Sequence, residues 1–490
     1  MEIWFFLLAT GLGVNLGFLI YVFYFKSLRR RLVLSQRSGG GDEERRKFFF
    51  PCEQGKKNRK AGEGQGPFSL RPQGQKVAVN SLVGGGGLSV VERSIHPSPS
   101  WEELTFNPVY LQRLPRLPAQ SIGTEAVIGP CSGRPLRIKI PIVLGGMGYK
   151  TPLRAETKQA LALGATLAGT AANTGRGPFL SVERSAAEKL ILQFSRGAWD
   201  KDIEVLGEAD AIELHLGSGL PGAANLDLPL HRLTGNVRLQ RSFGIAPEKP
   251  VIISSKLFRI KGRLDLANLI TYLRRKAGGI PVGVKIGSTQ GLERELELIT
   301  EAGPDFVAIV GMEGAQGGQT PSICRDLGIP TLFAISRARR FLEQKGLSGK
   351  VTLLAGGGLR RSSDFLKAMA LGAEVVFVGT AALGALCSGE DPSRLLRIPT
   401  KWGSKFFGQL GFHPPSAAEG VENFLKTSVR EMQTIAFSMG RRDLQEVTKD
   451  DLSTGNKDLA AALGISWYGT PEEVGRKARS IPQGEQGPGS

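Results

Sequence analysis

The sequence predicts an α/β protein whose main part is a (β/α)8 TIM barrel, preceded by a single N-terminal transmembrane helix and a disordered linker. From Ile140 onward, short apolar runs typical of buried strands alternate with helical stretches over about 250 residues. Upstream of this pattern, residues 3–25 carry no charged side chain, and residues 35–100 are rich in Gly, Lys and Gln. These three observations set the order of the parts.

The anchor is predicted from IWFFLLATGLGVNLGFLIYVFYF (3–25), which KSLRRR follows directly. Such a run can span a hydrocarbon core of about 30 Å as a helix. A buried core helix and a cleaved signal peptide are the alternatives, but the run is not amphipathic and has no basic n-region or A-x-A-like site. The basic flank places the following residues on the cytoplasmic side. We therefore expect a single-pass protein of the cell membrane with its catalytic domain in the cytoplasm.

Composition shifts divide the chain into five parts. We expect an anchor with its basic flank at 1–34, a flexible linker at 35–100, the barrel at 101–390, a C-terminal helical extension at 391–470 and a disordered tail at 471–490. The linker and the tail (QGEQGPGS) hold too few apolar residues to bury a core.

The charge and the cysteines exclude several classes of function. The net charge is +18, and the segment from Lys26 to Lys76 holds fourteen Lys/Arg against five Asp/Glu. A basic balance can indicate nucleic-acid binding, but aromatic residues are sparse there and no such motif is present, so no nucleic-acid partner is expected. The cysteines (Cys52, Cys131, Cys324 and Cys387) have neither CxxC nor metal-site spacing. No metal site is expected.

Eight strands and four intervening helices are predicted for the barrel. The strands are 140–147, 165–171, 190–197, 211–217, 281–287, 306–311, 351–357 and 374–381; the helices are 153–164, 265–278, 291–303 and 362–373. VIISSK (251–256) is a ninth strand-like run, which we place in an insertion after the fourth strand. The rival fold, an open doubly wound sheet, would carry G-x-G-x-x-G after an early strand, and no early strand of this sequence is followed by that pattern.

Two adjacent strand ends are rich in glycine, in VTLLAGGGLR (351–360) and VVFVGTAALG (375–384). In a (β/α)8 barrel the loops after strands seven and eight commonly bind phosphate. Gly356, Gly357, Gly358, Gly379 and Thr380 would let backbone N–H groups reach a phosphate with no side chain in the way. Relief of tight packing is the alternative role for these glycines.

Several spaced segments resemble the FMN-binding synthase domain of glutamate synthase, over about residues 120–460. They are LGGMGYKTPLRAETKQALALGATLAGTAANTGRGP (144–178), QFSRGAWDKDIEVLGEADAIELHLGSG (193–219), PVGVKIG, GMEGAQGGQTP (311–321), AGGGL, GTAAL and GVENFLKTSVREMQTIAFSMGRRDLQEVTKDDL (420–452). They occur in the family's order.

The resemblance implies FMN as the cofactor, with its phosphate at the five glycine and threonine positions above. It places Gly146, Met147 and Asn173 along the edge of the isoalloxazine ring. Lys285 would bind the cofactor and serve catalysis, because a cation near flavin N1/O2 stabilises the anionic reduced flavin. A lysine within an apolar strand must point into the barrel or find another partner.

The sequence also departs from the family pattern. After the fourth strand it reads LGSGLPGAANLDLP, with His215 where the family has its first lysine and no lysine afterwards. Of the C-x5-C-x4-C ligands only Cys387 is present, so no iron–sulfur cluster is expected. The chain begins Met-Glu-Ile-Trp rather than with a nucleophilic cysteine, so no glutaminase domain is expected. Arg176 and His215 remain as candidate substrate-binding residues.

The resemblance implies a glutamate-synthase-type oxidoreductase, acting on CH–NH2 donors, that reduces the imine of 2-oxoglutarate and ammonia to glutamate. The expected partners are a 2-oxo acid, ammonia, an external electron donor of unknown identity and the membrane. Two alternatives stay open. One is an FMN-dependent TIM-barrel oxidoreductase acting on another small substrate, and the other is a non-catalytic flavin-binding membrane scaffold.

Overall fold

The computed structural model describes residues 99–111, 119–149, 153–195, 203–218, 220–221, 262–314, 327–386 and 414–469. The expected anchor (3–25), the VIISSK run, Cys387 and the expected tail lie outside these residues. Within the described ranges, no helix combines the length and the apolar character needed to cross a bilayer.

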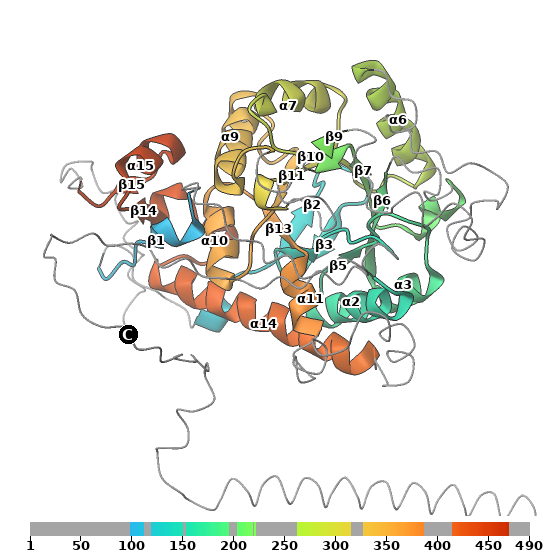
Figure 1. Cartoon of the computed structure of the whole chain (residues 1–490), viewed down its shortest axis with the longest axis horizontal. Coiled ribbons are helices and arrows are strands. Elements are labelled where there is room, and N and C mark those ends of the chain that lie inside the picture. The colour runs from blue at the N-terminus through green and yellow to red at the C-terminus, as the bar shows by residue number, and fades with distance from the viewer. Residues whose placement is uncertain are drawn as a thin grey trace, which may run out of the picture. The chain divides into compact units, whose positions relative to one another are not determined.

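Eight parallel strands form the central sheet (Figure 1). They are β4 (Ile142–Leu144), β5 (Ala171–Asn173), β6 (Lys189–Phe194), β7 (Ala211–His215), β10 (Val282–Gly287), β11 (Phe306–Val310), β12 (Thr352–Gly356) and β13 (Val375–Val378). The last strand pairs with the first, with Phe377 opposite Val143. Between β4 and β5, the Thr170 hydroxyl donates to the carbonyl oxygen of Ile142 at 2.6 Å. The sheet therefore curls into a nearly closed barrel, and the open-sheet alternative is wrong.

Helices connect the strands and cover the outside of the barrel. They are α2 (Ala155–Ala168), α3 (Ser181–Ala186), α6 (Arg263–Lys276), α7 (Leu292–Glu301), α9 (Thr331–Gln344), α10 (Ser362–Ala370) and α11 (Thr380–Leu386). The strand predicted at 165–171 is wrong in position, because α2 continues to Ala168 and ends at Gly169 in the left-handed conformation (φ 74°). A short run of Ala, Leu and Thr fits either helix or strand.

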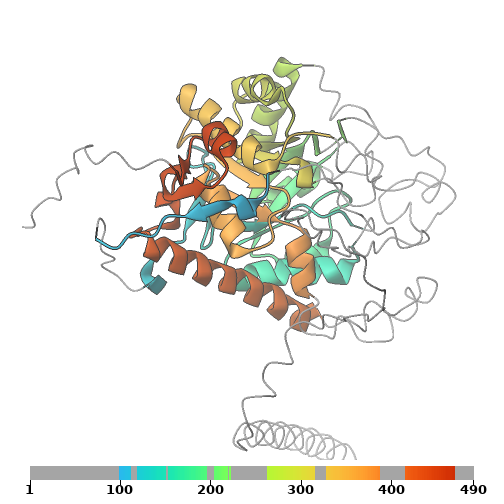
Figure 2. The same cartoon turned by 60° about the vertical axis from the view of Figure 1, so that its left-hand side comes forward.

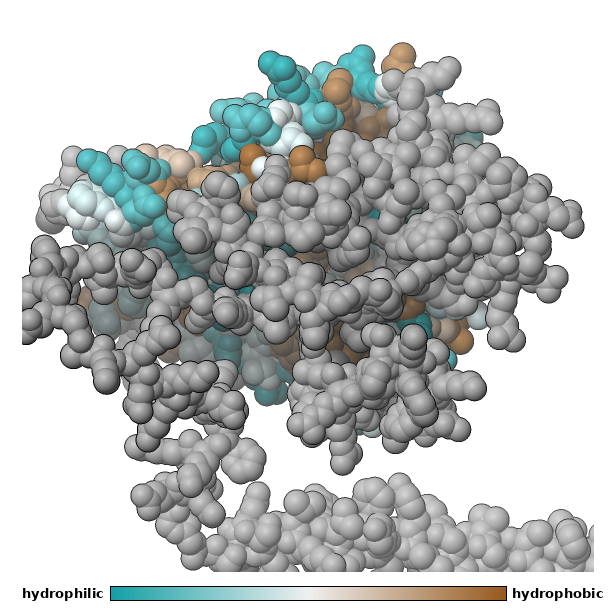
Figure 3. All heavy atoms as spheres, in the orientation of Figure 1, coloured by the Kyte–Doolittle hydropathy of each residue, from teal (hydrophilic) through white to brown (hydrophobic). Residues whose placement is uncertain are grey.

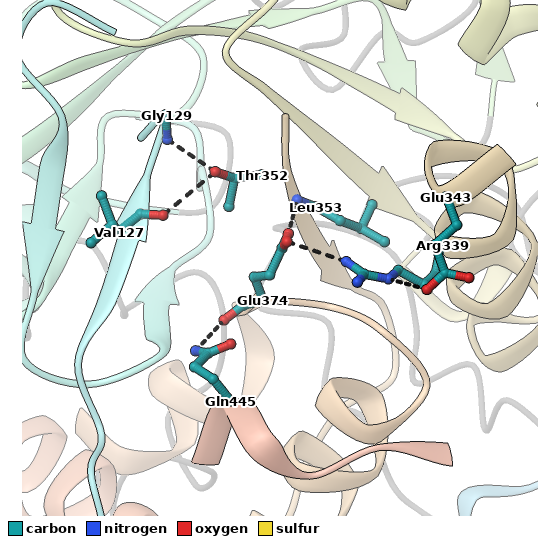
Figure 4. Close-up of polar contacts among 8 residues, drawn as sticks. All are labelled: Val127, Gly129, Arg339, Glu343, Thr352, Leu353, Glu374 and Gln445. Carbon is teal, nitrogen blue, oxygen red and sulfur yellow. Dashed lines mark hydrogen bonds and ion pairs between the residues drawn. The ribbon is translucent and has the colours of Figure 1, made fainter. Parts of the chain in front are cut away.

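A hairpin of β2 (Ala126–Ile128) and β3 (Leu136–Ile138) closes the amino-terminal end of the barrel. Its side chains share one buried cluster with inward-facing strand residues, including Phe306 and Val375. The backbone N–H of Gly129 donates to Thr352 Oγ1 at 3.0 Å, and the carboxylate of Glu374, just before β13, accepts from Leu353 N and Arg339 (Figure 4). This end is closed by packing and by these hydrogen bonds, which leaves the carboxyl ends of the strands for a site.

The residues after the barrel fold back onto it. Helix α14 (Pro414–Ser438) lies alongside α2 in both views (Figures 1 and 2). Strands β14 (Leu452–Thr454) and β15 (Ser466–Trp467) form a sheet with β1 (Leu104–Phe106). The extension predicted to be helical thus also contains two strands.

The remaining elements are short. They are η1 (Trp101–Glu103), η2 (Ala119–Ser121), η3 (Ile203–Glu208), η5 (Met312–Gly314), η6 (Leu444–Glu446), η7 (Lys449–Asp451), β8 (Gly217–Ser218), β9 (Leu220–Pro221) and α15 (Lys457–Leu463). Hydrophilic side chains prevail on the visible surface around α7 (Figure 3), where Arg294, Glu295 and Glu297 are exposed.

Thr352→Val should destabilise the barrel by about 1–3 kcal/mol, because the buried N–H of Gly129 then loses its acceptor while the side-chain shape is kept. Thermal unfolding of the purified chain measures the effect. Thr352→Ser keeps the hydroxyl group and should recover most of the loss. Equal melting temperatures for the wild type and Thr352→Val would show that this hydrogen bond does not hold the hairpin in place.

Candidate functional site

The predicted site residues that the structure describes gather at the carboxyl half of the barrel. Asn173 and His215 are the last residues of β5 and β7, and Lys285 lies in the carboxyl half of β10. Gly146 and Met147 follow β4, Gly356 ends β12, and Gly379 and Thr380 follow β13. Since the strands are parallel and the barrel is nearly closed, these positions form one ring.

Lys285 points into the barrel and is 5% exposed. Its Nζ lies 3.5 Å from Glu213 Oε1 and 4.4 Å from the centroid of the Phe377 ring. Asn173 Nδ2 donates to the same Glu213 oxygen at 3.1 Å. A buried cation therefore lies against a carboxylate and an aromatic face, and the same carboxylate binds Asn173, which is predicted to contact the flavin.

Gly146 approaches this polar interior closely. A methyl group at this position would collide with Gln193 Oε1 and Asn173 Oδ1, and Asn173 Oδ1 already accepts from Gly175 N at 2.9 Å. A larger residue at this position would therefore force Gln193 or Asn173 to move. The predicted contact of Gly146 with a ring edge stays a prediction.

The glycine-rich end of β12 has the backbone that only glycine adopts easily. Gly357 and Gly358 have φ of 123° and 69°. Thr331 Oγ1 lies 3.0 Å from the Gly357 carbonyl oxygen and 2.5 Å from Glu313 Oε2, which ties the loop after β11 to the loop after β12. Consecutive backbone N–H groups in such turns can form an anion-binding concavity.

Gly379, at the neighbouring strand end, faces open space. A side chain there would meet only Met147 Sδ, at 3.8 Å. Thr380, the first residue of α11, is exposed. The loops after β4 and β13 thus meet beside the glycine-rich turn of β12. At Gly379, only Met147 lies near the position that a side chain would occupy.

The two candidate substrate-binding residues are placed differently. His215 is 3% exposed, and its Cα lies opposite that of Lys285 in the β7–β10 pairing. Arg176 is half-buried in the loop after β5, and its carbonyl oxygen accepts from Tyr149 N at 3.0 Å. Both therefore lie at the carboxyl end of the barrel.

Lys158, on α2, was not predicted as a site residue and fixes the loops that carry Met147 and Asn173. Its Nζ donates to the carbonyl oxygens of Met147 (3.1 Å), Asn173 (3.2 Å) and Thr174 (2.9 Å). It also pairs with Glu183 at 2.7 Å, and both side chains are at most 3% exposed. A lysine in a helix normally indicates a solvated face, so this role could not be predicted from the sequence.

Gln193 and Glu213 were also missed, although a signal was present. Each interrupts an apolar strand, in LILQF and AIELH, at inward-facing positions. This is the argument that singled out Lys285, and it applies equally to them.

Residues 112–390 match the family model described as "Conserved region in glutamate synthase". The match extends over more than half of the chain. The chain belongs to the glutamate synthase family. The predicted family is thereby confirmed, and with it, at the level of the family, FMN as the cofactor.

The relatives differ in how much of their length is covered. The glutamate synthase large subunit-like protein of Rhizobium meliloti is 29% identical over 404 residues, covering 76% of this chain and 89% of that protein. The archaeal glutamate synthase [NADPH] of Methanocaldococcus jannaschii is 31% identical over 342 residues, covering 68% of this chain. The chain spans 64% of that enzyme's length. Among solved structures, a variant of an (S)-mandelate dehydrogenase chimera is similar, with 18% identity, a TM-score of 0.46, and coverage of 72% of this chain and 88% of that chain.

The residues of this glutamate synthase family barrel fit an FMN molecule. The flavin ring needs hydrogen-bonding groups and a cation within an otherwise apolar wall, and the interior offers Asn173, Gln193 and Lys285. The phosphate needs backbone N–H groups with space in front of them. The open side of Gly379 provides such space, and the positive φ angles of Gly357 and Gly358 form the adjoining turn, which packs against Thr331 and Glu313.

Lys158→Met should destabilise the protein by about 3–5 kcal/mol, because it removes the buried cation that pairs with Glu183 and binds three carbonyl oxygens. The double variant Lys158→Met/Glu183→Gln should regain part of that loss, since no lone charge is then buried. Unfolding by urea compares the three proteins. If the single and double variants lose the same stability, the pair is not coupled.

Proposed function

We propose that the chain is an FMN-dependent oxidoreductase that reduces the imine of 2-oxoglutarate and ammonia to glutamate. The observation that carries the proposal is the buried Lys285 ammonium, held inside the barrel beside Asn173 and below the glycine-bearing ends of β12 and β13. A positive charge in that place suits a cofactor that becomes anionic when it is reduced. Family membership supports the reaction class.

Each predicted residue has a role in this proposal. Reduced FMN would supply the hydride. Lys285 would hold a positive charge at the pyrimidine edge, while Gly146, Met147 and Asn173 would contact the ring. The backbone of Gly356, Gly357, Gly358, Gly379 and Thr380 would hold the phosphate.

A dicarboxylate substrate requires cations at the mouth of the barrel. Arg176, in the loop after β5, is a cation close to the expected ring edge, and His215 could donate a hydrogen bond from the end of β7. We propose that they bind the carboxylates of the 2-oxo acid, in place of the lysines that the family pattern has after the fourth strand.

Electrons and ammonia would come from outside this sequence. The archaeal relatives are named for NADPH. The G-x-G-x-x-G run of this sequence, GSGLPG (217–222), contains the short strands β8 and β9 where a dinucleotide fingerprint would open a helix. We propose a separate protein or small molecule as the electron donor.

The second candidate function is FMN-dependent reduction of another small substrate. The stretch LGSGLPGAANLDLP favours it, because that stretch lacks the lysines that the family pattern supplies for the 2-oxo acid. Both candidates use the same cofactor site and differ only in what reoxidises the flavin.

The phosphate site is tested at Gly379, where a side chain fits without a collision. Gly379→Asp should weaken FMN binding at least tenfold, about 1.4 kcal/mol, because a carboxylate would face the phosphate. Gly379→Ala should bind FMN nearly as the wild type does. Fluorescence titration with FMN and with riboflavin separates the causes, since riboflavin has no phosphate and should not distinguish Asp from Ala. Equal FMN affinity in Gly379→Asp and Gly379→Ala would place the phosphate elsewhere.

The reaction is tested by reducing the bound flavin without oxygen and then adding 2-oxoglutarate with ammonium. Flavin absorbance should recover, and glutamate should form in equal amount. Arg176→Ala should raise the KM for the oxo acid about tenfold or more with a smaller effect on kcat. A flavin that stays reduced with this pair but is reoxidised by another small molecule would establish the second candidate instead.

A further inference from the structure

Glu213 is a buried carboxylate inside the barrel to which the proposed reaction gives no role. Its side chain is 3% exposed, and its Oε1 lies 3.1 Å from Asn173 Nδ2 and 3.5 Å from Lys285 Nζ. Both neighbours are residues proposed above to contact the flavin. Glu213 therefore adds a negative charge in direct contact with two residues of the proposed cofactor site.

The strand register fixes where this charge lies relative to the lysine. Glu213 pairs with Gly283, whereas Lys285 pairs with His215, so the Cα atom of Glu213 lies one inward-facing position deeper in the barrel than that of Lys285. The ring of Phe377, 4.4 Å from Lys285 Nζ at its centroid, limits the space around the ammonium. The backbone of Lys285 is thus nearer to the mouth of the barrel than that of Glu213.

The two charges have opposite effects on a flavin at the mouth. The ammonium favours the anionic reduced form, and the carboxylate behind it disfavours that form. Because the side chains of Lys285 and Glu213 are only 7% and 3% exposed, water screens the field of each charge weakly. The net effect on the cofactor depends on both charges.

We infer that Glu213 sets the reduction potential of the bound flavin by offsetting part of the charge of Lys285. This inference rests on the proposed function, since it requires FMN at the mouth of the barrel. Glu213 acts through charge and through its hold on Asn173 and Lys285, and it need not touch the substrate.

The test is Glu213→Gln in the full chain loaded with FMN. Glutamine keeps the shape and an oxygen that accepts from Asn173, and it removes only the charge. The ratio of affinities for reduced and oxidised FMN should rise about tenfold, which corresponds to a potential about 30 mV more positive for a two-electron couple. Potentials are measured by equilibration with a reference dye.

Glu374→Gln is the matched control. Glu374 is also a carboxylate beside a cation, 3.3 Å from an Arg339 nitrogen, but it lies at the amino-terminal end of the strands (Figure 4). Its replacement should leave the flavin potential unchanged, even where it alters stability. A shift of equal size in both variants would mean that the effect is not local to the site and would overturn the inference.

If Glu213→Gln alone does not fold, the comparison of Lys285→Met with Lys285→Met/Glu213→Gln tests the inference instead. Lys285→Met leaves the carboxylate facing the flavin, and Lys285→Met/Glu213→Gln removes both charges, so reduced FMN should bind more tightly to the double variant. If Lys285→Met and the double variant bind reduced FMN equally well, or if Glu213→Gln leaves the potential unchanged, the inference about Glu213 is wrong. The proposal that the chain binds FMN would not be affected by either result. If the wild-type chain binds no FMN, the proposed function falls, and this inference falls with it.

Discussion

Pairing of the last strand with the first is the constraint on which the rest of the molecule depends. Val376 and Val378 of β13 lie opposite Ile142 and Leu144 of β4. Without that pairing, the carboxyl ends of β4 and β12–β13 would stand at opposite edges of a sheet. With it, Met147 comes within reach of Gly379, and the residues expected to contact the ring and the phosphate of one cofactor share one mouth.

The side chains inside the barrel change from apolar at its amino end to polar and charged toward its carboxyl end. The residues that stabilise the fold and those proposed to function thus lie in different parts of the interior. At the amino end, Phe306, Val375 and the β2–β3 hairpin form an apolar plug. Toward the carboxyl end, the inward positions hold Glu213 and Lys285 instead. Charged groups so far from water cost stability unless they are paired, and Lys285 and Glu213 pair with each other.

Much of the fold followed from the sequence, since the alternation of short apolar runs with helices predicted the barrel and placed seven of its strands within a few residues. The second strand was displaced, because ATLAGTA is mostly the end of α2, and nothing in its composition marks the helix end before Gly169. Hairpin β2–β3 and the pairing of β1 with β14 were missed, since they join residues far apart in the sequence or short segments with weak patterns.

The candidate site was predictable where a polar residue interrupts an apolar strand, as Lys285 does. The contacts between these residues could not be predicted. The sequence does not show that Lys285 contacts Glu213 and Phe377, or that Lys158 donates to three carbonyl oxygens. Those contacts depend on strand register and helix rotation, which the structure alone supplies. The buried lysine of α2 has the sequence context of a surface residue.

Hydrogen exchange of backbone amides, with and without FMN, tests the central claim most directly. The account predicts that FMN slows exchange at Gly356–Gly358, at Gly379 and in the loop around Met147, and leaves the hairpin at Val127–Gly129 unchanged. Protection confined to the amino-terminal end, or no protection at the carboxyl ends of β12 and β13, would contradict it.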